Sequence, residues 1–190
     1  MKSYFSIFTF LLFLGCTNNS TKENNTADTS QPKRTSTEFI KSKDSLISLL
    51  PGMKSDRIDC DANIYWRIIK RGKSSIPLLI ESLTDTTLTH VYDPCKKGRL
   101  NVSEVSYFAL EEIAEFPAFV VTDIQFDVYD QDGCSSFFDY LFDNKNKTDY
   151  QKKVRSFYDS NKFVYVQFED KDLSECRRKY HILGKLKWQE

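Results

Sequence analysis

The chain has 190 residues, and its 27 basic and 27 acidic side chains give a formal net charge of zero at pH 7. A balanced charge excludes the broad basic surface by which most nucleic-acid-binding proteins hold their ligand. No apolar run reaches the roughly eighteen residues that a transmembrane helix needs, so the sequence predicts no membrane-spanning segment.

The first fifteen residues have the pattern of a secretory signal peptide. Lys2 is their only charged residue, and an apolar run from residue 4 to residue 14 follows it. Leu12-Phe13-Leu14-Gly15-Cys16 then resembles a lipobox, the motif at which bacterial lipoproteins are cleaved and acylated. The resemblance implies that the mature chain begins at Cys16 and that Cys16 carries acyl chains such as palmitate. An ordinary signal peptide with an incidental cysteine is the alternative.

This reading places the protein in the cell envelope, lipid-anchored to the outer membrane on its periplasmic or its surface side. Several acyl chains give stable anchoring without a transmembrane helix. Residues 16–37 are almost entirely polar and have no apolar surface to bury, so we expect a disordered tether. A flexible chain of this length spans roughly 25 Å. Residues 38–190 are then of normal size for a single domain.

Two helical segments open this domain. Residues 45–50 form a short apolar-periodic piece that Pro51-Gly52 stops. The next segment has apolar residues on one face, as an amphipathic helix does. Asp59 or Asp61 is a suitable N-cap for it, and it extends to about Arg71 with Gly72 as its C-cap.

Two further helices are predicted, and they carry a resemblance. Ser74 or Ser75 is the expected N-cap of the first, and the second runs from about Val102 to Phe116. GKSSIPLLIESLTD (72–85) and VSEVSYFALEEI (102–113) resemble the helix pair of a HEAT repeat. The resemblance implies antiparallel helices with a concave face for protein partners. The mature chain as a whole also resembles uncharacterised lipoproteins of Gram-negative bacteria, which implies no particular activity.

Four cysteines remain when Cys16 is set aside, and an even number in an oxidising compartment predicts two disulfides. They are Cys60, Cys95, Cys134 and Cys176. We favour Cys95–Cys134 with Cys60–Cys176, because Cys95 would staple the long insertion at residues 86–101. Cys60–Cys95 competes with this pairing, and buried free thiols are a further alternative. The spacings contain no CxxC pair, so no zinc site is predicted.

The second half of the domain changes from helix to strand. Residues 119–129 alternate in places and are either a strand or irregular. Residues 137–142 and 148–161 have helical patterns, whereas residues 163–168 and 180–188 alternate as the strands of a hairpin do. The predicted fold class is therefore mainly α, with HEAT-like antiparallel helix pairs and a small C-terminal β-hairpin.

One acidic segment contains some of the residues of a calcium-binding loop. Asp127, Asp130, Asp132 and Gly133 resemble part of an EF-hand calcium loop. The first ligand position would be Val128, which has no ligand oxygen, so we interpret the segment as an acidic turn with Gly133 at a tight φ. No metal ion or cofactor is predicted.

The remaining polar residues show no catalytic arrangement. His90 and His181, the two histidines, lie outside any recognisable motif, and no catalytic residue is predicted. Two basic clusters, each next to a cysteine, are interpreted as solvated loops, with contact to anionic lipid headgroups as the alternative. The clusters are Lys96, Lys97 and Arg99, and Arg177, Arg178 and Lys179.

The sequence thus predicts a lipid-anchored binding or interaction module of the cell envelope. Its expected partners are the membrane, through the acyl anchor, and an envelope protein, with no nucleic acid. One alternative is an envelope hydrolase that uses an acidic pair from the segment between Asp127 and Asp132. The other is an immunity lipoprotein that protects the envelope against a toxin.

Overall fold

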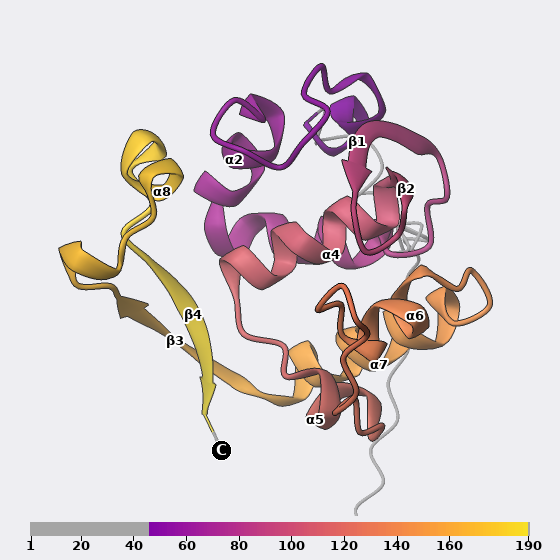
Figure 1. Ribbon diagram of the computed structural model, residues 1–190. Helices are drawn as coiled ribbons and strands as arrows, with labels where there is room; N and C mark the ends of the chain where they lie inside the picture. The colour runs from indigo at the N-terminus through magenta and orange to yellow at the C-terminus, as the bar shows by residue number, and fades with distance from the viewer. Residues whose placement is uncertain (1–45, 190) are drawn as a thin grey trace, which may run out of the picture. The chain divides into compact units, whose positions relative to one another are not determined.

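The computed structural model describes residues 46–189. The signal peptide, Cys16, the tether at 16–37 and the start of the predicted domain lie outside the described residues. Helices make up most of the regular structure, in agreement with a mainly α fold (Figure 1). The helices are η1 (Ile47–Gly52), α2 (Asn63–Lys70), η2 (Gly72–Ser75), α3 (Ile76–Ser82), α4 (Val102–Ile113), α5 (Ala118–Thr122), α6 (Ser136–Phe142), α7 (Lys147–Ser160), η3 (Asp170–Asp172) and α8 (Glu175–Tyr180). The strands are β1 (Leu88–Asp93), β2 (Gly98–Asn101), β3 (Lys162–Gln167) and β4 (Gly184–Gln189).

Helix α4 lies at the centre of the described part of the chain (Figure 1). It contacts η1, α2, α3, β2 and β4. Val105, Ala109 and Leu110 are buried among these elements, as their helical period predicts. The buried apolar side chains of the surrounding helices join the same core cluster. Neighbours on several sides explain why even polar residues of α4, such as Ser106, are buried.

The long insertion between α3 and α4 is a β-hairpin, which the sequence analysis did not predict. Strands β1 and β2 pair antiparallel, with Tyr92 opposite Arg99. At the turn, Asp93 Oδ1 accepts hydrogen bonds from the backbone N–H groups of Cys95 and Lys96. Such a side-chain-capped turn closes the hairpin without requiring glycine at its tip.

Two disulfides join distant parts of the chain, Cys95–Cys134 and Cys60–Cys176. Of the pairings left open by the sequence, the structure contains the favoured one. The first bond fastens the tip of the β1–β2 hairpin to the loop before α6. The second fastens α8 to the residues before α2, and the Tyr180 ring of α8 also stacks on Trp66 of α2. Within residues 46–189, no helix is long and apolar enough to cross a membrane.

The C-terminal hairpin forms as predicted, but its second strand starts later than expected. Strand β3 pairs antiparallel with β4 from Lys162 opposite Gln189 to Gln167 opposite Gly184. Tyr180, expected at the start of the second strand, ends helix α8 instead. Ser174 caps this helix by accepting a hydrogen bond from the Arg177 N–H. Six residues are too few for a helical period to be read from the sequence.

Several predicted helix ends are also wrong. Helix α2 follows Ala62 without a side-chain cap, because Asp59 Oδ1 accepts the Asp61 N–H in the preceding turn. Ser75 does not cap α3; its hydroxyl donates to the carbonyl of Ile68 and ties α3 to α2. Gly72 has a positive φ of 60° after α2, as expected for a residue that ends a helix.

The second half also has two corrected boundaries. Helix α4 ends at Ile113 rather than Phe116, because Ala114 is extended and forms a bridge with Leu186. The segment at 119–129 contains the short helix α5 and continues as irregular chain. Its sequence pattern is ambiguous because the first part of the segment is helical and the rest is irregular.

A buried polar network joins the first turn of α4 to its neighbours. Glu104 is fully buried, and its carboxylate accepts hydrogen bonds from the Asn101 N–H (2.8 Å), Lys96 Nζ (2.6 Å) and Lys147 Nζ (3.3 Å). Asn101 Oδ1 in turn accepts from the Glu104 N–H, which completes a capping box. Lys147 also donates to the hydroxyl of Ser103 (2.6 Å). One carboxylate therefore connects β2, the hairpin tip, α4 and α7.

We predict that Glu104→Ala strongly destabilises the protein. The change leaves the Lys147 ammonium buried without its counter-ion, which typically costs about 3–5 kcal/mol. Chemical denaturation gives the free energy of unfolding. Glu81→Ala is the control, because the Glu81–Arg155 ion pair is partly exposed and should contribute no more than about 1 kcal/mol. Equal losses for the two variants would contradict the structural role of Glu104.

Candidate ligand-binding pocket

A pocket of about 400 Å³ opens between α2, α4, the β1–β2 hairpin and the loop that precedes α2. This volume is within the range of small-molecule sites. We call it the aromatic pocket. The residues that line it are Arg57, Ile58, Tyr65, Val91, Tyr92, Asp93, Pro94, Leu100, Phe108, Glu111 and Glu112.

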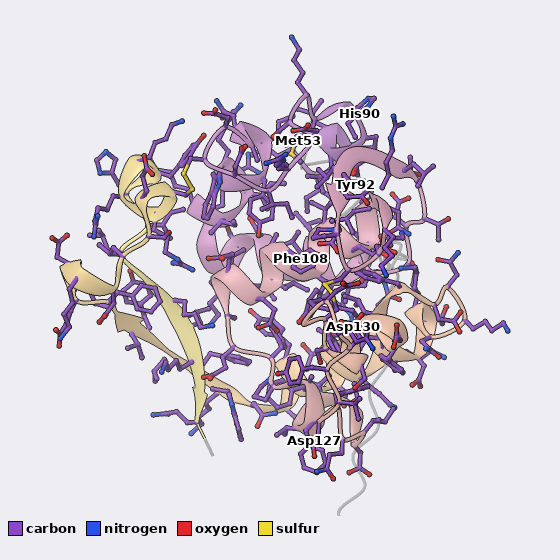
Figure 2. The ribbon with its side chains drawn as sticks, viewed as in Figure 1. Met53, His90, Tyr92, Phe108, Asp127 and Asp130 are labelled. Atoms are coloured by element: carbon purple, nitrogen blue, oxygen red, sulfur yellow. A yellow bond between two sulfur atoms is a disulfide. The ribbon has the colours of Figure 1, made fainter. Side chains whose placement is uncertain are left out.

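The wall of the aromatic pocket consists of apolar and aromatic side chains from three elements. Tyr65 of α2 is buried, Phe108 of α4 is half-buried, and Tyr92 of β1 is 52% exposed. In Figure 2, Tyr92 on the hairpin lies above Phe108 on the central helix. The Tyr92 N–H donates to the carbonyl of Asp56 (2.8 Å), which ties the hairpin to the loop before α2. These contacts hold the rings around one cavity.

Glu111 is the unusual polar residue of the aromatic pocket. Its Oε1 atom is buried and has no hydrogen-bond partner within the described residues. Burial is the main reason that the pKa of Glu111 is raised from 4.5 to about 7, and the nearby Glu115 adds to the rise. Lys185 and the Phe116 N–H act in the opposite direction. Glu111 therefore changes its charge near neutral pH.

The other two carboxylates of the aromatic pocket have partners. Glu112 forms an ion pair with Arg177, which also donates to the Glu112 carbonyl (2.7 Å). Asp93 Oδ1 accepts from the two N–H groups of the hairpin turn, those of Cys95 (2.9 Å) and Lys96 (3.0 Å). Glu111 is thus the pocket carboxylate with an oxygen left to satisfy.

The acidic segment at 127–133 does not contribute to this pocket. Asp127, Asp130 and Asp132 are exposed, and Figure 2 shows Asp127 and Asp130 below α4. Asp130 Oδ1 accepts the N–H groups of Asp132 (2.9 Å) and Cys134 (2.8 Å), and Gly133 has a φ of 79°. The segment is an acidic turn in which the Asp130 carboxylate is hydrogen-bonded to the backbone of the turn itself.

The two histidines do not lie together in a candidate site. His90 lies exposed on β1, and His181 lies exposed at the end of α8 with a φ of 56°. Among residues 46–189, no group of three or more His, Cys, Asp or Glu side chains is arranged to hold a metal ion. Neither histidine lines the aromatic pocket.

The two basic clusters are partly structural rather than free to contact lipid. Lys96 is held by Glu104, and Arg177 is buried against Glu112. Lys97 pairs with Asp132 (3.0 Å) at the surface. The cluster at 177–179 lies in helix α8 instead of the predicted loop. Its Lys179 pairs with Asp61 (2.9 Å) and so adds to the contact between α8 and the residues before α2.

Glu111 is not among the site residues predicted from the sequence, although the pattern of residues 102–113 contains a signal for it. A helix over residues 102–113 places Glu111 three residues after Phe108 and seven after Glu104, on one face. Acidic residues on a face that also carries a large ring are unusual for a solvated surface. The hairpin that closes the pocket has no such signal, because its strands are short and separated by a four-residue turn.

No protein-family model matches this chain, and neither the curated proteins nor the solved structures contain a match to it. The chemistry of the aromatic pocket is therefore inferred from its own side chains.

We predict that Glu111 makes stability depend on pH. Below about pH 4.5 the carboxyl is protonated in both states, and between pH 4.5 and about 7 the folded state keeps a proton that the unfolded state has lost. The contribution of Glu111 to stability therefore falls as pH rises through this range, by on the order of 3 kcal/mol. Glu111→Gln removes this dependence.

Denaturation of wild type and Glu111→Gln from pH 4 to pH 8 measures the effect. The stability of the variant relative to wild type should improve as pH rises and level off above pH 7. Glu169→Gln is the control, since Glu169 is exposed and lies outside the pocket. Parallel profiles for Glu111→Gln and wild type would contradict the raised pKa.

Proposed function

We propose that the protein is a lipid-anchored binding module of the cell envelope and that the aromatic pocket is its ligand site. The lipobox-like residues 12–16 and the polar stretch at 16–37 support the anchor and the tether. The observation that carries the binding site is a cavity of about 400 Å³ lined by Glu111, whose buried Oε1 atom has no hydrogen-bond partner within residues 46–189.

The state of Glu111 favours a functional pocket over a packing defect. Leaving a buried acceptor unsatisfied typically costs about 1–3 kcal/mol. Proteins tolerate few such groups, and carboxyls of strongly raised pKa concentrate at sites that bind or react. A cavity lined by rings with one unsatisfied polar atom also matches the usual composition of small-molecule sites.

The architecture of this module is proposed to include one HEAT-like helix pair, α3 with α4. The contact between these two helices supports this proposal, as does the resemblance of their sequences to a HEAT helix pair. The β1–β2 hairpin stands where a HEAT repeat has a short turn, and this hairpin supplies one wall of the aromatic pocket. The departure from the repeat pattern thus coincides with the proposed site.

A second candidate function is hydrolysis, and Glu111 is the observation that favours it. A carboxyl with a pKa of about 7 suits general acid–base chemistry at neutral pH. Glu112 lines the same pocket, so the acidic pair of this candidate is Glu111 and Glu112 rather than residues of the exposed turn. A hydrolase would release a chemically changed product, whereas a binding module releases its ligand unchanged.

We predict that Tyr92→Ala weakens the binding of small aromatic probes. Tyr92 is half-exposed and lines the pocket, so its removal costs ring contacts without emptying the core. Loss of one aromatic contact of about 1 kcal/mol lowers affinity roughly 5-fold. Saturation-transfer NMR of the full chain with indole as the probe gives the dissociation constants.

Tyr129→Ala is the matched control for this test, because Tyr129 is 68% exposed and is not among the residues of the aromatic pocket. The control should bind indole as wild type does. No detectable binding of indole to wild type, or equal weakening in both variants, would remove the pocket as the proposed site.

We also predict that Cys16→Ser abolishes acylation of the protein. Acyl chains contribute roughly 0.8 kcal/mol for each buried methylene, and Cys16 is the residue expected to carry them. Labelling of expressing cells with a palmitate analogue measures acylation. Cys60→Ser is the control and should be labelled as wild type is, since Cys60 belongs to a disulfide of the domain. Equal labelling of Cys16→Ser and wild type would contradict the anchor.

A further inference from the structure

The aromatic pocket carries more negative than positive groups. Asp93, Glu111 and Glu112 line it, against the single cation Arg57, which is exposed at its edge. The partners of Asp93 and Glu112 come from the hairpin turn and from Arg177, so these two carboxylates are already bound. The carboxylate oxygen of the lining that remains without a partner among the described residues is Glu111 Oε1.

A ligand that approaches Glu111 has to supply a donor. The buried Oε1 atom accepts no hydrogen bond within the described residues, and an ionised carboxylate accepts only. A positively charged donor gains most, because hydrogen bonds between charged groups are roughly twice as strong as neutral ones. An anionic ligand would add a like charge to the carboxylates already present.

The rings of the aromatic pocket favour the same kind of ligand. Tyr92 and Phe108 line the cavity and keep exposed surface, and the faces of such rings attract cations. The half-buried side chain of Ile58 adds an apolar contact for a hydrocarbon or aromatic body. Metal ions do not fit this environment, because they require several oxygen or nitrogen ligands around one point.

We propose that the aromatic pocket binds a small organic amine in its protonated form, with the ammonium at Glu111 and the apolar body against Tyr92 and Phe108. This inference rests on the proposed function and names the ligand class of the same site. Binding requires the ionised form of Glu111, so affinity increases as pH rises through the neutral range.

The test uses three probes of nearly equal shape and different charge. They are phenethylamine, phenethyl alcohol and 3-phenylpropionate, titrated into the full chain at pH 8 and followed by NMR. We expect phenethylamine to bind at least 10-fold more tightly than the alcohol, and 3-phenylpropionate to bind more weakly than either. From pH 6 to pH 8 the amine should gain roughly 10-fold in affinity, while the alcohol stays constant.

Two variants separate charge from shape. Glu111→Gln keeps the size of the side chain and should reduce the affinity for phenethylamine at least 10-fold, leaving that for the alcohol unchanged. Glu169→Gln removes the same charge from an exposed position and should leave both affinities as in wild type. The native signal dispersion of each variant is recorded first, so that a loss of folding is not taken for a loss of binding.

The outcomes distinguish a failure of the amine class from a failure of the proposed ligand site. Equal binding of amine and alcohol, or an unchanged amine affinity in Glu111→Gln, overturns the amine class and leaves a pocket for apolar ligands. Absence of binding for all three probes overturns the proposed ligand site itself, and the amine class with it.

Discussion

The carboxylate of Glu104 is the interaction on which the described structure most depends. It is fully buried at the start of the central helix and receives donors from the hairpin tip, the β2 end and α7. Charged groups leave water at a high cost, so such a centre holds only when every partner is in place. The hairpin is therefore fixed to α4 from within, and its disulfide to Cys134 adds a second attachment at the surface.

This attachment explains how a short hairpin forms a wall of a pocket. An isolated two-stranded hairpin is marginally stable in water. Here Lys96, in the hairpin turn, reaches Glu104, and the Tyr92 N–H is bonded to the chain before α2. The same central helix carries Glu104 in its first turn and Glu111 near its end. The Glu104 carboxylate has its hydrogen bonds satisfied and stabilises the fold. The Glu111 carboxylate has an unsatisfied oxygen and gives the aromatic pocket its chemistry.

The sequence predicts the helices with a long apolar period and misses the features that depend on contacts between distant residues. The face of α4 and the helices at 136–142 and 147–160 follow from spacing alone, and the favoured cysteine pairing agrees with the structure. The β1–β2 hairpin and α8 are too short to show a period. Glu111 reads as a surface residue until the hairpin, α2 and β4 surround it, so the pocket had no complete signature in the chain.

The Cys60–Cys176 disulfide holds a late part of the chain next to the elements that form the aromatic pocket. It joins residues 116 positions apart, whereas Cys95 and Cys134 are separated by 39. The residues that line the aromatic pocket all precede Ile113, but Arg177, the partner of Glu112, is among the last to be synthesised. The charge of Glu112 is therefore balanced by a residue 65 positions later in the chain. Because Cys176 directly precedes Arg177, the disulfide also restrains the residue that balances this charge, although neither cysteine lines the pocket.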